Sequence, residues 1–370
     1  MNTESARQYA RIRNRLLLID LIGSLMLLAF IQWSGLSRGI VAWWSHRVTA
    51  QPLLVLGYLA VFGSLSYVVM LPLHFYSSFR LEHRFGLSRM TLKDWCVREA
   101  KQLAVSAVLG AVLVEGLYAL LRHAPTTWPL WATIGWVGFT IILARVFPTV
   151  LLPIFYKTTP LEDAQLVQRL LALCQKVGLS ALGVFRFNLG AETRKANAAL
   201  AGLGKTRRVL LADTLLEGFT PEEIEGVLAH ELAHHRYHHI TSLLLISAVG
   251  SWVAFSLTAA SAHRWGGILG LTSLADIAGF PLFMLWLSIL GLIGLPIQNG
   301  FSRYFEWQAD RFAVATTRLP QAFADALRRL AALNLADPNP PAWMVWFFYD
   351  HPPIAQRIEA AERFVPSMEP

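Results

Sequence analysis

The chain has 370 residues, of which 55% are hydrophobic and only 15% are charged, and its mean hydropathy is +0.45. This composition is typical of a membrane protein and excludes an ordinary soluble enzyme. The formal net charge of +8 does not indicate a nucleic-acid partner, because the basic residues flank apolar segments and do not form one stripe.

Six apolar segments are long enough to cross a bilayer as helices. They are residues 16–33, 53–73, 103–121, 128–152, 241–262 and 277–298. The first is too long for a signal peptide and lacks a small-residue cleavage site, so we interpret it as an anchor. Inside the spans, Glu115 and Arg145 are costly in lipid unless they pair or lie near an interface.

The basic residues indicate how these spans are oriented. They concentrate before the first segment (Arg7, Arg11, Arg13, Arg15) and after the second (Arg80, Arg84, Arg89, Lys93, Arg98, Lys101), and they are sparse on the other side. By the positive-inside rule, both termini and residues 157–240 face the cytoplasm. Arginine far outnumbers lysine, which favours a GC-rich bacterial genome and therefore an integral protein of the bacterial inner (plasma) membrane.

The segment between the fourth and fifth spans has mixed periodicity. Residues 158–177 have helical periodicity, whereas residues 184–188, 196–201 and 208–212 have strand character. An exposed edge strand can bind an extended peptide through backbone hydrogen bonds, and residues 195–199 are the candidate. The alternative is an ordinary strand of a small domain.

A His-Glu-x-x-His motif follows at residues 230–234. Thr220, Pro221 and Glu223 predict that a helix begins ahead of it with a capping box. On a helix, His230 and His234 lie on one face and can share one Zn²⁺, which leaves Glu231 free beside the metal. Surface histidines are the alternative interpretation of so short a pattern.

The neighbouring histidines do not complete this site. His238 continues the spacing of four, but it lies about 12 Å from His230 along a helix, too far for one ion. The third ligand must therefore come from elsewhere in the chain.

Residues 302–313 read as a helix that carries Glu306 and Asp310 on one face. Glu306 is the candidate third ligand of a two-His, one-Glu site that leaves a position open for water. Asp310, one turn later, can orient a ligating imidazole. The alternative is a solvated acidic face paired with Arg303 or Arg311.

Taken together, these segments resemble the integral-membrane zinc CAAX prenyl endopeptidases of type I, which are gluzincins. The resemblance rests on the order and spacing of residues 81–87, Asn197-Ala198, 206–216, 230–240, 306–310, and His351-Pro352-Pro353 with Arg357. Family members commonly have seven spans around a water-filled chamber, whereas six are counted here. The family often has Trp where this chain has His235.

The resemblance implies a role for each matching residue. It implies that His230, His234 and Glu306 bind one zinc ion and that Glu231 is the general base. It places Asn197 and Ala198 on the substrate-binding edge strand, and Asp310 and Arg357 behind the metal. His351, which a helix after Pro341 would return to the site, would stabilise the oxyanion.

We therefore predict a predominantly α-helical polytopic membrane protein with about six transmembrane helices and a cytoplasmic-side gluzincin α+β zinc metallopeptidase domain. Residues 1–156 would form an N-terminal transmembrane region with four spans. Residues 157–370 would form the metallopeptidase domain, interrupted by a transmembrane hairpin at about 241–298.

The predicted function is that of a membrane-embedded zinc metalloendopeptidase. Its partners would be membrane lipids and a peptide or membrane-associated protein substrate, lipidated or not, and no nucleic acid. A quality-control metalloprotease of the bacterial heat-shock type is the main alternative, although those enzymes have fewer spans before the sheet. The polar flanks of the motif helix argue against a site-2-type intramembrane protease, and a non-enzymatic scaffold would leave the ligand set unexplained.

Overall fold

The computed structural model describes residues 3–202, 207–268, 271 and 273–364. Thr206, in the quoted segment 206–216, and the last six residues of the predicted second domain lie outside the described residues. Within them, six helices are long and apolar enough to cross a membrane, which confirms the predicted fold class and number of spans. They are α1 (Thr3–Trp33), α3 (Gln51–Phe75), α5 (Leu92–His123), α6 (Trp128–Val146), α11 (His239–Ile268) and α12 (Phe280–Thr317).

Two of these helices continue through a short π-helical turn. Helix α3 leads through η1 (Tyr76–Arg80) into α4 (Leu81–Arg84), and α6 leads through η2 (Phe147–Leu151) into α7 (Leu152–Phe155). Pro72 precedes the first turn and Pro148 lies in the second. A proline removes a backbone donor from the helical ladder, which is a common cause of such local rearrangement.

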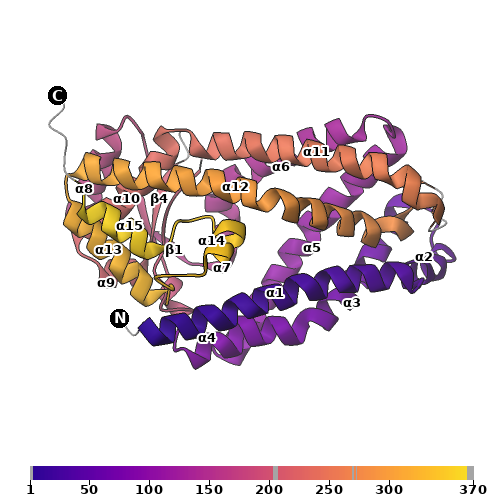
Figure 1. The fold of residues 1–370 in the computed structure, drawn as a ribbon, viewed down its shortest axis with the longest axis horizontal. Coiled ribbons are helices and arrows are strands. Elements are labelled where there is room, and N and C mark those ends of the chain that lie inside the picture. Colours follow the sequence, from indigo (N-terminus) through magenta and orange to yellow (C-terminus); the bar gives the residue numbers. More distant parts are fainter. Residues whose placement is uncertain (1–2, 203–206, 269–270, 272, 365–370) are drawn as a thin grey trace.

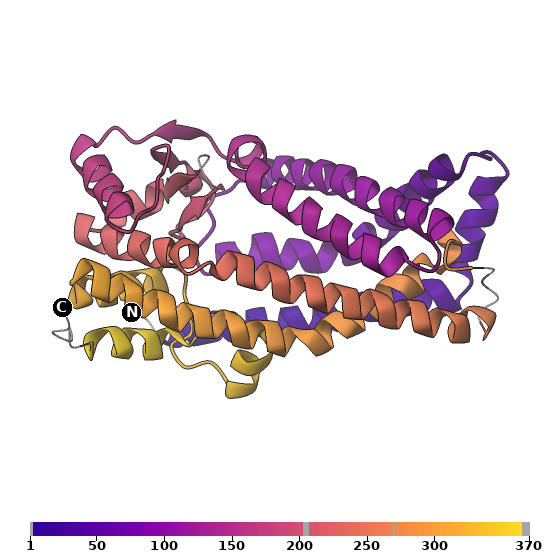
Figure 2. The ribbon, with the colours of Figure 1, turned by 90° about the horizontal axis from the view of Figure 1, so that it is seen from above.

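The molecule is elongated, and the α/β part lies at the end that carries both chain termini (Figures 1 and 2). The short helix α2 (Leu36–Ser45) and the connection from α11 to α12, which includes η5 (Ile277–Gly279), lie at the opposite end. An even number of spans requires this placement of the termini.

The sheet has four strands in the order β1-β2-β4-β3. They are β1 (Thr158–Pro160), β2 (Val184–Phe187), β3 (Ala198–Ala201) and β4 (Arg208–Ala212), and only β2 and β4 are parallel. The last three confirm predicted strands. The helix predicted over 158–177 was wrong at its start: residues 158–160 pair with β2, and α8 (Ala164–Lys176) begins only after Asp163, whose side chain caps it.

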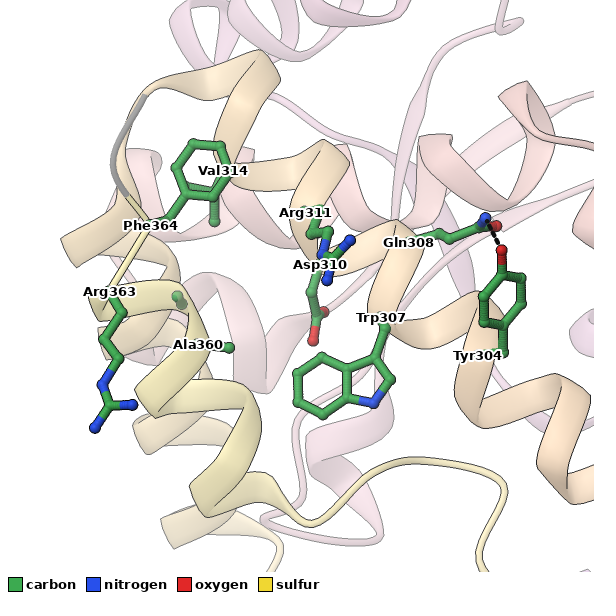
Figure 3. Close-up of a pocket in the computed structure, with 10 residues that line it drawn as sticks. Tyr304, Trp307, Gln308, Asp310, Arg311, Val314, Ala360, Arg363 and Phe364 are labelled. Atoms are coloured by element: carbon green, nitrogen blue, oxygen red, sulfur yellow. Dashed lines mark hydrogen bonds between the residues drawn. The ribbon is translucent and has the colours of Figure 1, made fainter. Parts of the chain in front are cut away.

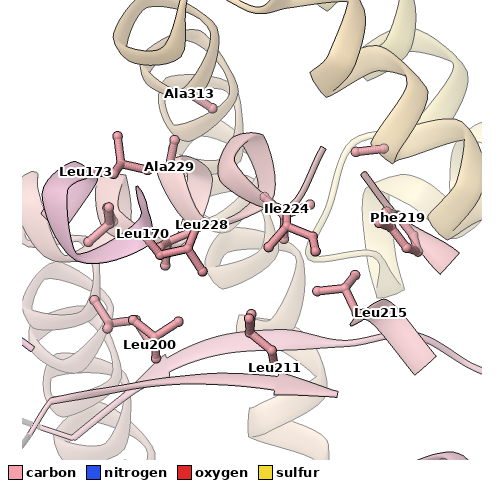
Figure 4. Close-up of a cluster of buried hydrophobic side chains, with 14 of the residues drawn as sticks. Leu170, Leu173, Leu200, Leu211, Leu215, Phe219, Ile224, Leu228, Ala229 and Ala313 are labelled. Carbon is pink, nitrogen blue, oxygen red and sulfur yellow. The ribbon is translucent and has the colours of Figure 1, made fainter. Parts of the chain in front are cut away.

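A buried apolar cluster joins this sheet to the helices around it (Figure 4). Leu200 and Leu211 from the sheet meet Leu170 of α8 and Leu228 of α10 (Pro221–Arg236). The cluster extends to α9 (Asp213–Gly218), α12 and α13 (Pro320–Leu333). It therefore holds α10 against α12, the two helices with the predicted metal ligands.

The remaining short elements are η3 (Leu189–Ala191), α14 (Ala342–Phe348) and α15 (Ile354–Glu362). Helix α15 packs against α13 and α12.

The structure does not pair Glu115 with Arg145. Arg145 is exposed, and Glu115 Oε1 is buried with no hydrogen-bond partner among the described residues. Arg145 lies in the last turn of α6, but the helical span continues through η2 and α7 to Phe155.

Candidate metal centre

Helix α10 begins as the sequence predicts. The Thr220 Oγ1 atom accepts from the Glu223 backbone N–H at 3.3 Å, and the Glu223 carboxylate accepts from the Thr220 N–H at 2.8 Å. Pro221 occupies the first turn. These contacts satisfy backbone donors that the helix cannot use, and they fix the first turn of the helix whose later turns carry His230 and His234.

The structure brings Glu306 of α12 to these two histidines. The two Nε2 atoms of His230 and His234 lie 3.2 Å apart. Glu306 Oε2 lies 3.3 Å from His230 Nε2, and Glu306 Oε1 lies 3.3 Å from His234 Nε2. Tetrahedral ligands with bonds of about 2.0–2.1 Å lie about 3.3–3.4 Å from one another, so the three side chains could hold a metal ion.

The carboxylate oxygens at this position also fit a cation. Three carboxylates gather here (Glu231, Glu306, Asp310), and Arg357 contacts Glu306 and Asp310. Glu306 Oε2 is buried and accepts no hydrogen bond from the described residues. A buried carboxylate oxygen without a donor is costly, and a divalent cation would compensate it.

Asp310 and Arg357 form a buried pair behind the three side chains. Arg357 Nε and Nη2 donate to the two Asp310 oxygens at 2.8 and 2.7 Å. Asp310 Oδ1 also lies 2.9 Å from His230 Nδ1. Because this carboxylate faces Nδ1, it favours the His230 tautomer whose Nε2 lone pair is available to a metal.

The pKa values of His230 and Glu231 reflect these neighbours. Burial alone disfavours a charged imidazole, but the neighbouring carboxylates of Asp310 and Glu306 outweigh it and raise the pKa of His230 to about 9. Desolvation raises the pKa of the Glu231 carboxyl group. A carboxylate with a raised pKa is a stronger base than one in water.

The chain returns to the site at His351, after α14. His351 Nε2 lies 3.4 Å from Glu306 Oε1, and Nδ1 lies 2.7 Å from Asp350 Oδ1. Burial opposes the charged form of His351, but the hydrogen bond to Asp350 and the Glu306 charge outweigh it and raise its pKa. A protonated His351 presents an N–H donor beside the candidate metal position.

His239, which the sequence analysis did not select, contacts the other ligand candidate. This residue is 2% exposed, and its Nδ1 lies 3.2 Å from His234 Nδ1. Its Nε2 lies 2.9 Å from Gln308 Oε1, and Gln308 Nε2 donates to the Tyr304 hydroxyl at 3.0 Å. The imidazole stacks on Phe305 with 4.5 Å between ring centroids.

Strand β3 is an edge strand, and its outer side is partly occupied. Residues alternate along an antiparallel strand between facing the neighbour and facing away, and the Ala212 N–H donates to the Asn197 carbonyl. Residues 196, 198 and 200 therefore face the free side. There the Ala196 N–H donates to Asn334 Oδ1 at 3.2 Å, and His235 Nε2 lies 3.0 Å from the Leu200 carbonyl.

Ala198 lies between these two occupied positions. No hydrogen bond from the described residues reaches its N–H or its carbonyl on the free side. The side chain of Asn197 is exposed and that of Ala198 is partly buried. Residues 81–87 contact the segment that leads into β3. The Arg194 N–H donates to the Leu87 carbonyl, and Lys195 forms an ion pair with Glu82.

A cavity of about 620 Å³ lies between α12 and the end of α15 (Figure 3). Of the described residues that line it, only Asp310 also contacts a ligand candidate. Tyr304 and Gln308, at the end of the hydrogen-bond chain from His234, form another part of its wall. The cavity adjoins the candidate metal centre and does not contain it.

Comparison with known families decides what kind of protein this is. The family model described as "CAAX prenyl protease N-terminal, five membrane helices" matches residues 2–157, and the model of peptidase family M48 matches residues 160–365. The chain belongs to peptidase family M48. It is therefore an integral membrane metallopeptidase that resembles the CAAX prenyl proteases, which confirms the predicted family and class of enzyme.

Known M48 proteins resemble the chain over most of its length. CAAX prenyl protease 1 of Saccharomyces cerevisiae is 30% identical over 338 residues, 86% of this chain and 74% of the yeast protein. An uncharacterized metalloprotease of Bacillus subtilis, YhfN, is 27% identical over 362 residues, 97% of this chain and 85% of that protein. The crystal structure of S. mikatae Ste24p superposes with a TM-score of 0.86 at 25% identity, and covers 97% of this chain and 89% of that one.

The N-terminal M48 region differs in one respect from the description of its model. That description names five membrane helices, whereas four helices of spanning length begin within residues 2–157 of this chain. The longest of the other helices described there is α2, whose ten residues extend about 15 Å and are too short to cross the roughly 30 Å hydrocarbon layer.

Proposed function

We propose that this M48 enzyme is a zinc endopeptidase in which His230, His234 and Glu306 bind one Zn²⁺ per chain. The mutual distances of their ligand atoms carry this proposal, since they match a tetrahedral site with one position left for water or substrate. Such a zinc ion lowers the pKa of water and polarises a carbonyl group.

The protein side chains supply the remaining chemistry of peptide hydrolysis. Glu231 takes a proton from the attacking water as that water adds to the scissile carbonyl carbon. Glu231 then gives the proton to the departing amine, so that the C–N bond breaks and a carboxylate and an amine leave. The N–H group of His351 donates to the oxygen that becomes negative during the attack. Asp310 and Arg357 hold His230 and Glu306 in position.

We further propose that the substrate binds as an extended peptide along β3. Its backbone would pair with the N–H and carbonyl of Ala198, beside Asn197. The named relatives are CAAX prenyl proteases, and on that analogy membrane-associated peptides, including lipidated ones, are the substrate class we propose. Arginine-rich usage favours a bacterial source, so substrates without a prenyl group are included.

The proposed location is the bacterial inner membrane, with the site and both termini in the cytoplasm. The positive-inside pattern supports this orientation. We also propose a division at residue 156 into an N-terminal membrane region and a metallopeptidase domain at 157–370 interrupted by a membrane hairpin at 241–298. The boundary between the two matching family models supports this division.

The test compares zinc content and peptide cleavage in purified wild type, Glu231→Gln and Glu306→Ala. Glu231→Gln should keep one zinc per chain and lower the cleavage rate by about 100- to 10,000-fold. Glu306→Ala should weaken zinc binding by at least about 100-fold. Loss of a residue that only hydrogen-bonds to a ligand already lowers metal affinity by up to about 100-fold, and loss of a direct ligand should lower it at least as much. Glu359→Gln, on the exposed face of α15, is the matched control and should change neither property. Full activity in Glu231→Gln, or undiminished zinc binding in Glu306→Ala, would contradict the assigned roles.

A further inference from the structure

Helix α14 exposes large aromatic side chains that the proposed chemistry does not use. All seven of its residues are apolar. Trp343 is 55% exposed and Trp346 is 60% exposed, whereas Met344 is buried against the protein. Exposed tryptophans grouped on one element commonly mark an interaction surface.

Two polar side chains of α12 fix the level of α14 along the molecule. Asn299 Nδ2 donates to the Phe347 carbonyl at 2.7 Å, and Arg303 donates to the carbonyls of Val345 and Tyr349 at 2.9 and 2.6 Å. These donors satisfy carbonyls at the helix end. The sixth apolar segment ends at residue 298. Asn299 and Arg303 therefore attach α14 to α12 within five residues, about 7.5 Å along the helix, of the end of that segment.

This level coincides with the border of a lipid-facing surface. Ile289, Ile293, Ile297 and Phe301 recur every four residues on α12 and are 36%, 67%, 63% and 45% exposed. This row forms one side of a membrane-spanning helix, and it ends level with α14. Figure 2 shows α14 projecting from the molecule beside α12. The interfacial layer is roughly 5–8 Å deep on each side of a bilayer.

We propose that α14 is an interfacial anchor whose Trp343 and Trp346 side chains lie in the lipid headgroup layer. Tryptophan is enriched at this depth because its ring is apolar and its N–H can still find a polar partner. The occupant is the bilayer that already surrounds α12, because Asn299 and Arg303, which hold α14, lie at the level where the exposed apolar row of α12 ends. His351 follows α14 by three residues, so the anchor also fixes the segment that reaches Glu306.

The test measures depth by electron paramagnetic resonance on the full chain in lipid nanodiscs. A nitroxide label is attached at Trp346→Cys and, separately, at Trp343→Cys. The background is Cys96→Ser, because Cys96 is exposed whereas Cys174 is buried. Ile293→Cys on α12 and Gln356→Cys on the exposed side of α15 serve as lipid and water controls.

Oxygen collides most often with labels in lipid, and a nickel chelate with labels in water. The labels on α14 should show an oxygen-to-nickel ratio several-fold above that of Gln356→Cys and below that of Ile293→Cys. Ratios equal to the Gln356→Cys control at both α14 positions would overturn the anchor. The measurement needs neither zinc nor catalysis, so its outcome is independent of the proposed activity.

Discussion

The ring orientation of His234 is set by residues that contact it from outside the candidate metal centre. Its Nε2 must be unprotonated to bind a metal, so its Nδ1 carries the proton and donates to His239 Nδ1. His239 then carries its proton on Nε2 and donates to Gln308 Oε1. Each bond in this chain requires the next, and together they select the tautomer of His234 that can bind zinc.

We therefore expect His239→Phe to weaken zinc binding by about 10- to 100-fold. The phenyl ring keeps the stacking on Phe305 but has no acceptor for the His234 proton. Zinc affinity, measured by competition with a chromophoric chelator, tests this directly. His238→Asn is the matched control, since His238 is exposed and has φ of 57°, which asparagine tolerates. Equal affinities in the two variants would contradict the role of His239.

The sequence allowed the prediction that His230 and His234 face one metal ion, because helical spacing is a local property, and the resemblance to the CAAX prenyl endopeptidases implied Glu306 as the third ligand. His239 could not be found in the same way. On a continuous helix, a residue five positions after His234 would point to another face. Helix α10 ends at Arg236, and His238 adopts a left-handed conformation before α11 begins at His239. That break turns the His239 ring back toward His234.

At the level of elements, the available edge of β3 is short. Asn334 from the segment after α13 occupies the Ala196 N–H, and His235 of α10 occupies the Leu200 carbonyl. Only Ala198 still offers both backbone groups on the free side among the described residues. One residue of an extended substrate can therefore form two backbone hydrogen bonds with β3, to the N–H and the carbonyl of Ala198.

This geometry predicts the result of N-methylation along a cleavable peptide. Methylation of the one backbone nitrogen that pairs with the Ala198 carbonyl should raise KM by about 3- to 10-fold, the equivalent of one hydrogen bond of roughly 1 kcal/mol. Methylation one residue to either side should leave KM nearly unchanged, because those N–H groups point away from β3. Steady-state kinetics on the methylated series measures this. An equal effect at three consecutive positions would contradict edge pairing at Ala198.

The strands illustrate where local patterns suffice and where they fail. The strand character of residues 208–212 predicted β4 at its observed bounds. The pattern of residues 158–160 was masked by the amphipathic helix that follows, and the strand exists because it pairs with β2, a neighbour about 25 residues later. Which side of β3 remains free depends on the sheet order, a tertiary property that no local pattern contains.

At the scale of the whole molecule, the fold places the candidate centre at the end of the helix bundle that carries both termini (Figure 1). Helix α10 leads into α11, and Glu306 lies on α12, the second helix of the same membrane hairpin. The hairpin therefore joins the two halves of the candidate metal site, and we expect it to hold that site close to one membrane boundary. The basic residues in the first half of α1 and after α3 belong to this same end.

Positive residues are retained on the cytoplasmic side, so the site should be unreachable from outside the cell. Cysteines introduced in a Cys96→Ser background into full-length protein in intact bacteria test this with a membrane-impermeant maleimide. Ser45→Cys and Thr126→Cys, exposed at the α2 end, should be labelled at once. Glu217→Cys and Gln356→Cys, exposed at the other end, should be labelled only after the membrane is permeabilised. The reverse pattern would put the site outside the cytoplasm, and labelling of all four positions in intact cells would contradict a barrier between the two ends.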